Sequence, residues 1–209
     1  MPPARLAAPC LMIFARAPVP GQCKTRLMRR HGARGAARIH RQLTLRTLAT
    51  AAATGMRVQL WCAPDTRHGF FHACRRQWGV TLQRQPSGDL GRKMSRVLAQ
   101  ALARGAPSAV IVGTDCPALT AHDLAQAFQT LERDADWVLQ PAADGGYVLL
   151  GARLAAPGAL RGIAWSSGHE LRQTLAHLRA RGLRTTLLPQ LWDVDHPVDL
   201  RRARREKLL

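Results

Sequence analysis

Two aspartates far apart in the sequence, Asp115 and Asp195, stand in settings that suit ligands for a metal or a polar substrate. Asp115 belongs to the segment Gly-Thr-Asp-Cys-Pro at residues 113–117, directly after the apolar run 109–112. A hard divalent cation takes one or two protein carboxylates and completes its shell with water and substrate phosphates. The two aspartates are therefore candidate catalytic groups and ligands of Mg²⁺ or Mn²⁺. The alternative for Asp115 is a structural role only, because Asp-X-Pro is favoured in turns.

A cationic loop at residues 18–26, with the sequence Pro-Val-Pro-Gly-Gln-Cys-Lys-Thr-Arg, is a candidate phosphate-binding segment. Gly21, Lys24, Thr25 and Arg26 stand where this loop enters a helical pattern, and Lys24 is a candidate catalytic group together with the two aspartates. A loop that feeds a helix N-terminus offers free backbone N–H groups and the positive end of the helix dipole to an anion. It is not a Walker A loop, because the G-x-x-x-x-G-K-[ST] spacing is absent. The alternative is a surface turn with solvated cations.

The few lysines point to the same chemistry. Arginine supplies 28 of the 31 cationic residues, so a single arginine carries little information here. Lys24 and Lys93, two of the three lysines, both fall in glycine-containing stretches that lead into helical patterns. A compact ammonium suits a phosphate at such a position.

A glycine pair in the segment Pro-Ala-Ala-Asp-Gly-Gly-Tyr, residues 141–147, is a further candidate site. Asp144, Gly145 and Gly146 offer a backbone that turns tightly or lies close to a ligand. The alternative is a plain hairpin on the Asp-Gly turn, and both interpretations can hold together.

Alternating strands and helices must position these residues. Apolar runs and helical periodicity predict strands at 10–15, 57–63, 80–83, 109–112, 137–140, 148–150 and 185–188. They predict helices at 33–53, 65–78 with Asp65 or Thr66 as the cap, 92–104, 121–131 and 169–181, and a basic helical end at 201–209. This alternation of strands and helices along the chain is typical of an α/β fold with a mostly parallel sheet. Asp115 then follows a strand at its carboxyl end, the edge where open α/β sheets bind ligands.

Composition narrows the class of protein. The length of 209 residues favours one domain, 1–209, and no run of 18 apolar residues or signal peptide is found, so we expect a cytoplasmic protein without a membrane span. Five dispersed cysteines without a C-x-x-C pair indicate reduced thiols. The formal charge of +18 is compatible with anionic partners, but few aromatic residues lie among the cations, which disfavours nucleic acid.

Six sequence motifs occur in this chain in the same order as in one known family. The chain resembles a bacterial family of nucleotide-diphospho-sugar transferases of unassigned reaction with the GT-A fold, the DUF2064-like group also labelled a glycosyltransferase associated with radical-SAM proteins. It is more distantly similar to phospholactate and molybdenum-cofactor guanylyltransferases. The motifs lie at residues 15–27, 88–94, 113–117, 144–147, 165–167 and 193–200. The resemblance implies a single three-layer αβα domain of the nucleotide-diphospho-sugar transferase type.

The resemblance also implies roles for individual residues. Lys24 and Arg26 would contact nucleotide phosphates, Asp115 and Asp195 would hold the metal, and the glycine pair would border the sugar or the acceptor. The full substrate-binding set that we expect is Gly21, Lys24, Thr25, Arg26, Lys93, Asp144, Gly145, Gly146 and Trp165, of which Trp165 is alternatively a packing residue. The chain departs from the family pattern at Arg16, Ser167, His196 and Val198.

Three functions stay open at this stage. The first is metal-dependent transfer of a sugar from a nucleotide-diphospho-sugar to an unknown small-molecule acceptor, although Gly113 replaces the first Asp of the D-x-D pair. The second is nucleotidyl transfer from an NTP to a phosphorylated acceptor, although the Gly-Gly-x-Gly-x-Arg pattern is absent. The third is an inactive basic nucleotide- or nucleic-acid-binding protein. Asp144, Asp193 and His196 are alternative general bases.

Overall fold

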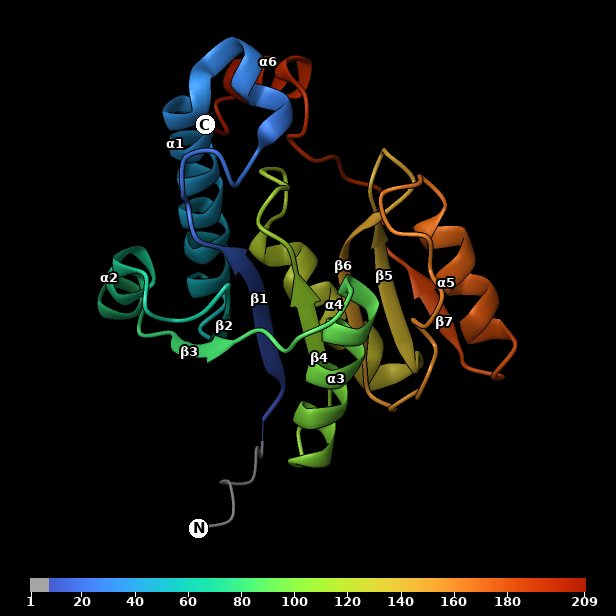
Figure 1. The fold of residues 1–209 in the computed structure, drawn as a ribbon. Helices are drawn as coiled ribbons and strands as arrows, with labels where there is room; N and C mark the ends of the chain where they lie inside the picture. Colours follow the sequence, from blue (N-terminus) through green and yellow to red (C-terminus); the bar gives the residue numbers. More distant parts are fainter. Residues whose placement is uncertain (1–7) are drawn as a thin grey trace.

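The fold is a seven-stranded sheet with helices on both faces (Figure 1). The structure is a computed structural model that describes residues 8–209. Its strands are β1 (Cys10–Arg16), β2 (Val58–Ala63), β3 (Thr81–Arg84), β4 (Ala109–Val112), β5 (Trp137–Pro141), β6 (Tyr147–Ala152) and β7 (Thr185–Leu187). Its helices are α1 (Thr25–Ala52), α2 (Gly69–Trp78), α3 (Leu90–Ala103), α4 (Ala121–Arg133), α5 (Glu170–Arg179) and α6 (Pro197–Arg205).

The sheet is mostly parallel, as predicted. The strand order is β3-β2-β1-β4-β6-β5-β7, and only β6 runs against its two neighbours. The β5–β6 pair is a hairpin around the Asp-Gly turn. Because β1 and β4 are parallel neighbours, the loops that follow them leave the sheet at the same edge.

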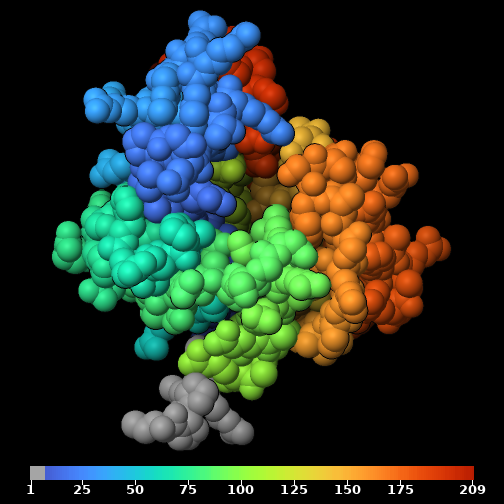
Figure 2. All heavy atoms as spheres, viewed as in Figure 1, coloured from blue at the N-terminus to red at the C-terminus, as the bar shows by residue number. Residues whose placement is uncertain are grey.

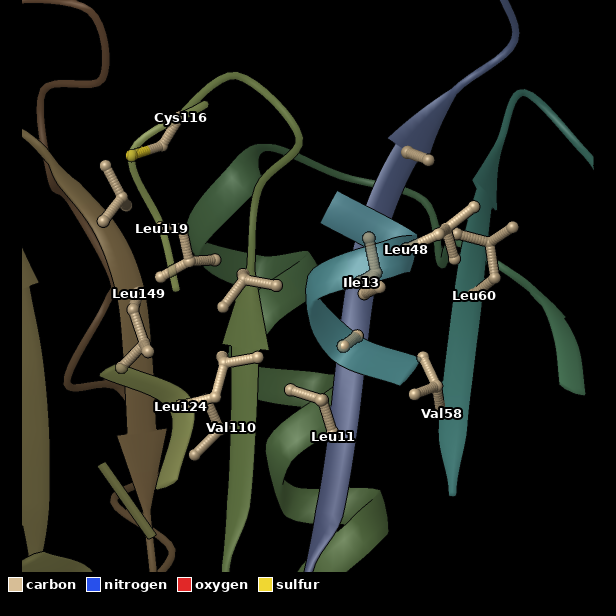
Figure 3. Packing of buried hydrophobic residues seen from close by; sticks show 14 of the residues in the cluster. Leu11, Ile13, Leu48, Val58, Leu60, Val110, Cys116, Leu119, Leu124 and Leu149 are labelled. Carbon is tan, nitrogen blue, oxygen red and sulfur yellow. The ribbon is translucent and has the colours of Figure 1, made fainter. Parts of the chain in front are cut away.

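The two faces of the sheet have separate apolar cores. Along β1, Leu11 and Ile13 pack in one cluster and Met12 packs in the other, since successive side chains of a strand point to opposite faces. The first cluster takes side chains from α1, α2 and α4. Figure 3 shows Leu48 of α1 and Leu124 of α4 with strand residues of this cluster. The second takes side chains from α3 and α5. These layers confirm the predicted αβα architecture.

A third cluster holds the C-terminal segment against the start of α1. Leu27, Ile39 and Leu43 of α1 pack with Val194 and with other residues of the late segment, namely Trp192, Leu200 and Ala203. Figure 1 shows α6 beside the first turns of α1. This packing places Asp193 and Asp195, the neighbours of Val194 in the sequence, at the edge of the sheet where the loop after β1 begins.

The helix starts required corrections. The helix predicted from residue 33 begins at Thr25, and Gly32, at φ 66°, breaks its regular geometry. The cap of α2 is His68, whose side chain accepts from Phe70 N–H, whereas Asp65 accepts from Arg67 instead. Asp89 caps α3 by accepting from Arg92 N–H, so this helix begins two residues earlier than predicted.

The tail predicted as a basic helical end at 201–209 belongs to α6, which begins at Pro197 and ends at Arg205. Proline at the first helical position is favoured because its missing N–H would have no partner there. Within residues 8–209, no helix is both long enough and apolar enough to cross a membrane.

Candidate functional site

The candidate site lies at the carboxyl edge of β1 and β4. Asp115 follows β4 by three residues, and its carbonyl oxygen accepts from Val194 N–H at 2.9 Å. This backbone hydrogen bond joins the late segment to the β4 turn, so that Asp195 arrives beside Asp115. The two aspartates singled out in the sequence therefore meet in space.

Lys24 stands between these two carboxylates. Its Nζ lies 2.9 Å from Asp115 Oδ1 and 3.0 Å from Asp195 Oδ1, and only 5% of its side chain is exposed. Arg26 Nη1 donates to the other oxygen of Asp195 at 3.0 Å. Burial lowers the pKa of Lys24, but the two carboxylates outweigh it, so the net shift is upward. For Asp195, burial raises the pKa, but Lys24 and Arg26 outweigh it and the net shift is downward.

The backbone of Lys24 is strained in a way that serves this arrangement. With φ 48° and ψ 46°, it occupies the left-handed region, which costs a non-glycine residue about 1–3 kcal/mol. The next residue, Thr25, begins α1, and no side chain caps that helix start. The first turn therefore presents backbone N–H groups next to two cationic side chains, a combination that suits an anion.

His40 is a site residue that sequence reasoning missed. It lies on the buried face of α1, and its Nε2 is 3.0 Å from the Arg16 carbonyl oxygen. Because a carbonyl only accepts, Nε2 carries the proton. Burial lowers the pKa of His40, so the ring is neutral near pH 7, and its Nδ1 lies 3.9 Å from Asp115 Oδ1. The only available signal was its place on the apolar face of the predicted helix, one helical turn before Leu43 and Thr44.

A cavity of about 750 Å³ opens beside these groups. Figure 2 shows a hollow between the blue N-terminal part of the molecule and orange residues of the C-terminal part. The sequence-predicted residues on its wall are Lys24, Thr25, Arg26, Lys93, Asp115 and Asp195, and Arg16 and His40 join them. Gly21, at φ 88°, shapes the loop before this wall but does not line the cavity.

A second cavity, of about 300 Å³, adjoins the first. Both have Phe14, Leu90, Gly113, Asp115 and Ser166 on their walls. The predicted residues Asp144, Gly146 and Trp165 line this smaller cavity, together with Tyr147, Glu170 and Asp193. The predicted site therefore divides into two compartments that meet at Asp115.

The glycine pair has two different roles in the structure. Gly146 donates its N–H to Asp144 Oδ1 at 3.0 Å and faces the smaller cavity. Gly145 does not line it, but a Cβ there would collide with the Gly168 carbonyl oxygen, and its φ is +90°. Gly145 is thus required for close approach of two turns and not for direct contact with the cavity.

Two side chains of the smaller cavity have marked properties. Trp165 packs edge-on against Tyr147, with 6.2 Å between the ring centroids, so it both packs and forms part of the wall. Burial raises the pKa of Asp193 to about 7, and the neighbouring Asp115 and Asp144 add to that rise. His196 lines neither of these two cavities.

Sequence comparison places the chain beside one bacterial family. The profile described as "Uncharacterized protein conserved in bacteria (DUF2064)" matches residues 44–167. The matched span contains Asp115 and the glycine pair, whereas Lys24 and Asp195 lie outside it. No significant match to a curated protein was found.

Solved structures with the same fold include proteins named as transferases and one named as a synthetase. A proposed nucleotide-diphospho-sugar transferase of Desulfovibrio desulfuricans G20 is 27% identical, with a TM-score of 0.82 over 90% of this chain and 82% of its own. The 2-C-methyl-D-erythritol 4-phosphate cytidylyltransferase of Thermus thermophilus is 16% identical, with a TM-score of 0.58 over 96% and 98% of the two chains. CMP:2-keto-3-deoxy-manno-octonic acid synthetase, complexed with CTP, is 11% identical, with a TM-score of 0.60 over 96% and 98%. The predicted family, fold class and transferase class are confirmed.

Proposed function

This chain belongs to the DUF2064 family of bacterial proteins, and from that premise we propose that it is a metal-dependent transferase that moves a glycosyl group from a nucleotide-diphospho-sugar to a small-molecule acceptor. The observation that carries the proposal is the convergence of Asp115 and Asp195 on the ammonium of Lys24 at the carboxyl edge of the sheet. The 27% identical neighbour named as a nucleotide-diphospho-sugar transferase supports the same class of substrate.

The larger cavity has the charge that a nucleoside diphosphate needs. Arg16, Lys24, Arg26 and Lys93 all line it, beside the start of α1, which no side chain caps. Charge-assisted hydrogen bonds from such groups are stronger than neutral ones and fix an oxyanion in place. In this proposal the four cations hold the diphosphate and stabilise the charge that develops on it when the sugar leaves.

The two aspartates offer donor atoms that suit a divalent metal. Both are hard carboxylates, both are partly exposed at 43% and 37% of the side chain, and their oxygens approach a single cationic group. Mg²⁺ is often bound by one or two carboxylates plus water and phosphate oxygens. Within residues 8–209, no group of three or more His, Cys, Asp or Glu side chains is placed to enclose a metal, so the remaining ligands would come from substrate and water. Such a metal would neutralise diphosphate charge.

The transfer step is a substitution at the anomeric carbon. The acceptor oxygen forms a bond to that carbon, while the bond from the carbon to the diphosphate oxygen breaks and its electron pair stays on the nucleoside diphosphate. The acceptor hydroxyl must release its proton to a base within hydrogen-bond reach. Asp144 and Asp193 line the adjoining cavity and remain alternative bases, whereas His196 lines neither cavity and is less well placed for that role.

Nucleotidyl transfer is the second candidate. The pairing of one early and one late aspartate through Lys24 also suits attack of an acceptor phosphate on the α-phosphate of an NTP, with pyrophosphate as the leaving group. The two functions differ in the ligand that should bind, so a ligand screen separates them.

The test is a thermal-shift screen of UDP, GDP, CDP, ADP and TDP sugars and the NTPs, each with and without Mg²⁺ or Mn²⁺. A ligand that binds only the native state raises the melting temperature by mass action. We expect a metal-dependent shift with one nucleotide-diphospho-sugar. A shift with an NTP alone would support nucleotidyl transfer, and the absence of any shift would contradict both transferase proposals.

A further inference from the structure

We propose that the smaller cavity is the acceptor subsite and that it selects an alcohol that carries no phosphate or carboxylate group. The inference rests on the proposed function and specifies its unknown substrate. It is carried by the division of charge between the two adjoining cavities.

The cationic side chains line the larger cavity together with Asp115 and Asp195, whereas the described wall of the smaller cavity has carboxylates and no cation. The larger cavity is lined by Arg16, Lys24, Arg26 and Lys93. Among the described residues that line the smaller cavity there is no lysine or arginine, whereas the carboxylates there are Asp115, Asp144, Glu170 and Asp193. An anionic group is attracted by the cations of the larger cavity and repelled by the carboxylates of the smaller one.

Asp144 and Glu170 have no cationic partner to cancel their charge, whereas Asp193 is in part protonated near pH 7 because burial raises its pKa to about 7. Asp115 pairs with Lys24, but Asp144 accepts only from Gly146 N–H, and Glu170 accepts from Ser167 N–H at 2.8 Å. Within residues 8–209, no ion pair to Asp144, Glu170 or Asp193 is formed. Like charges in a partly buried cavity are weakly screened by salt, so a phosphate or carboxylate on the acceptor is disfavoured.

The remaining wall defines the body of the acceptor. The edge-on pair Tyr147 and Trp165, with Phe14, forms an aromatic side, and Ile111 and Leu149 add aliphatic surface. A volume of about 300 Å³ is within the range of small-molecule sites. A compact hydroxylated molecule with C–H surface, neutral or bearing an amine, matches this combination of apolar wall and carboxylates.

The junction of the cavities explains why this compartment belongs to the acceptor. Asp115, Gly113 and Ser166 line both cavities, so a molecule in the smaller one has its polar end next to the group that pairs with Lys24. The diphosphate then lies on the cationic side and the attacking hydroxyl on the acidic side. The same division disfavours a phosphorylated acceptor and so favours glycosyl transfer over nucleotidyl transfer.

The charge of each cavity can be measured with reagents that do not depend on knowing the substrate. Tyr147→Cys puts a thiol in the smaller cavity and Gln22→Cys puts one in the larger. Each variant is treated with a methanethiosulfonate that carries a trimethylammonium group and with one that carries a sulfonate, and rates are normalised to those of a free thiol. Because the two variants have the same net charge and differ only in where the thiol stands, the high overall charge affects both and cancels in the comparison.

We expect the ratio of cationic to anionic labelling rates to be at least tenfold higher for Tyr147→Cys than for Gln22→Cys. Adding Asp144→Asn to Tyr147→Cys should lower that ratio. Equal ratios at the two positions, or a preference for the sulfonate at Tyr147→Cys, would overturn the proposal. If Tyr147→Cys does not fold, Ser166→Cys at the border of the cavities replaces it. Its ratio of cationic to anionic labelling rates should lie between the value expected for Tyr147→Cys and that of Gln22→Cys. A ratio equal to that of Gln22→Cys would contradict the proposal.

A second measurement separates this inference from the proposed function. Tyr147→Cys labelled with a small neutral methanethiosulfonate should keep the nucleotide-dependent thermal shift of the unlabelled variant. Loss of that shift would mean that the smaller cavity holds the donor, and the acceptor assignment would be wrong. An unlabelled protein without any nucleotide shift would instead contradict the proposed function, while the labelling ratios would still report the charge of the cavities.

Discussion

Lys24 Nζ lies 3.0 Å from Asp195 Oδ1, although 171 positions separate the two residues along the chain. The same ammonium lies 2.9 Å from Asp115 Oδ1, and Arg26 Nη1 lies 3.0 Å from Asp195 Oδ2. Two cations thus balance two carboxylates at the centre of the candidate site. A substitution at any of the four removes at least one of these ion pairs, and this coupling is the basis of the first two predictions.

Lys24→Ala should weaken binding of a nucleoside diphosphate by about 10- to 100-fold, because it removes a charge-assisted hydrogen bond to phosphate. The corresponding nucleoside, which has no phosphate, should bind almost unchanged. Isothermal titration calorimetry of both ligands checks this, with Arg205→Ala on the exposed end of α6 as the control variant. Equal weakening of nucleoside and nucleotide would show that Lys24 does not grip the phosphates.

Asp115→Asn should remove the metal dependence of nucleotide binding, because the amide is a poorer ligand for a hard cation than the carboxylate. The native fold should persist, since the side chain is 43% exposed. The matched control is Asp134→Asn, an exposed aspartate after α4 that lines neither cavity. Titration of nucleotide with and without Mg²⁺ or Mn²⁺ measures the effect, and unchanged metal dependence in Asp115→Asn would exclude the ligand role.

Asp136 should contribute stability that is present near neutral pH and lost in acid. Its carboxylate accepts from Arg153 Nη2 at 2.9 Å and from Arg184 N–H at 3.0 Å, which ties the starts of β5 and β7 to the end of β6. Burial raises its pKa, but the hydrogen bonds from Arg184 and Arg153 outweigh this and the net shift is downward. Its folded pKa is therefore below the unfolded value of about 4, and the stabilisation disappears as the pH falls through the folded pKa.

The Asp136→Asn variant tests this at two pH values. At pH 7 it should lose about 2 kcal/mol of unfolding free energy, the order expected when a buried hydrogen bond to a charged group is removed. In urea unfolding near pH 3, the difference from the unsubstituted protein should shrink. A difference that stays constant between the two pH values would contradict the assignment, and Asp134→Asn is again the control.

Gly145→Ala should destabilise the protein more than Gly55→Ala does. Both glycines have positive φ, +90° and +70°, so both substitutions are strained. Only at position 145 does the added Cβ meet backbone, the Gly168 carbonyl oxygen, whereas nothing lies within 4 Å at position 55. Chemical denaturation measures the free energy of unfolding of both variants. By analogy with overpacking, we expect Gly145→Ala to lose more than Gly55→Ala by above about 1 kcal/mol, and this difference is the cost of the clash. Equal losses would show that the two turns can separate at little cost.

The five cysteines should be inert in the native protein. All are free and buried, as the scattered sequence pattern indicated. Burial raises the pKa of Cys116 and Cys62 to about 12 and that of Cys10 and Cys74 to about 11, so the reactive thiolate is scarce. A disulfide reagent at pH 8 should therefore label no thiol quickly before denaturation and all five after it. Rapid native labelling would identify an exposed thiol, with Cys23 beside Lys24 as the first to check.

Much of the fold could be predicted from the sequence because its signals are local. The apolar run before Gly113 specifies β4, and Thr120 with Asp123 forms the capping box that begins α4. The helix starts were less predictable, since polar loops offer several caps. The chain uses His68 for α2, where Asp65 also matched the pattern.

The sequence by itself determined the order of strands and helices, the place of Asp115 after a parallel strand, and the cationic loop that enters α1. Only the tertiary structure decided that Asp195 meets Lys24, that His40 faces Asp115, and that the cations line the larger of the two adjoining cavities and not the smaller one. The physical reason is that hydrophobic periodicity and turn chemistry act over a few residues. The meeting of Lys24 and Asp195 depends instead on the packing of Val194 against α1 and on its backbone hydrogen bond to Asp115, contacts between distant segments that no local pattern encodes.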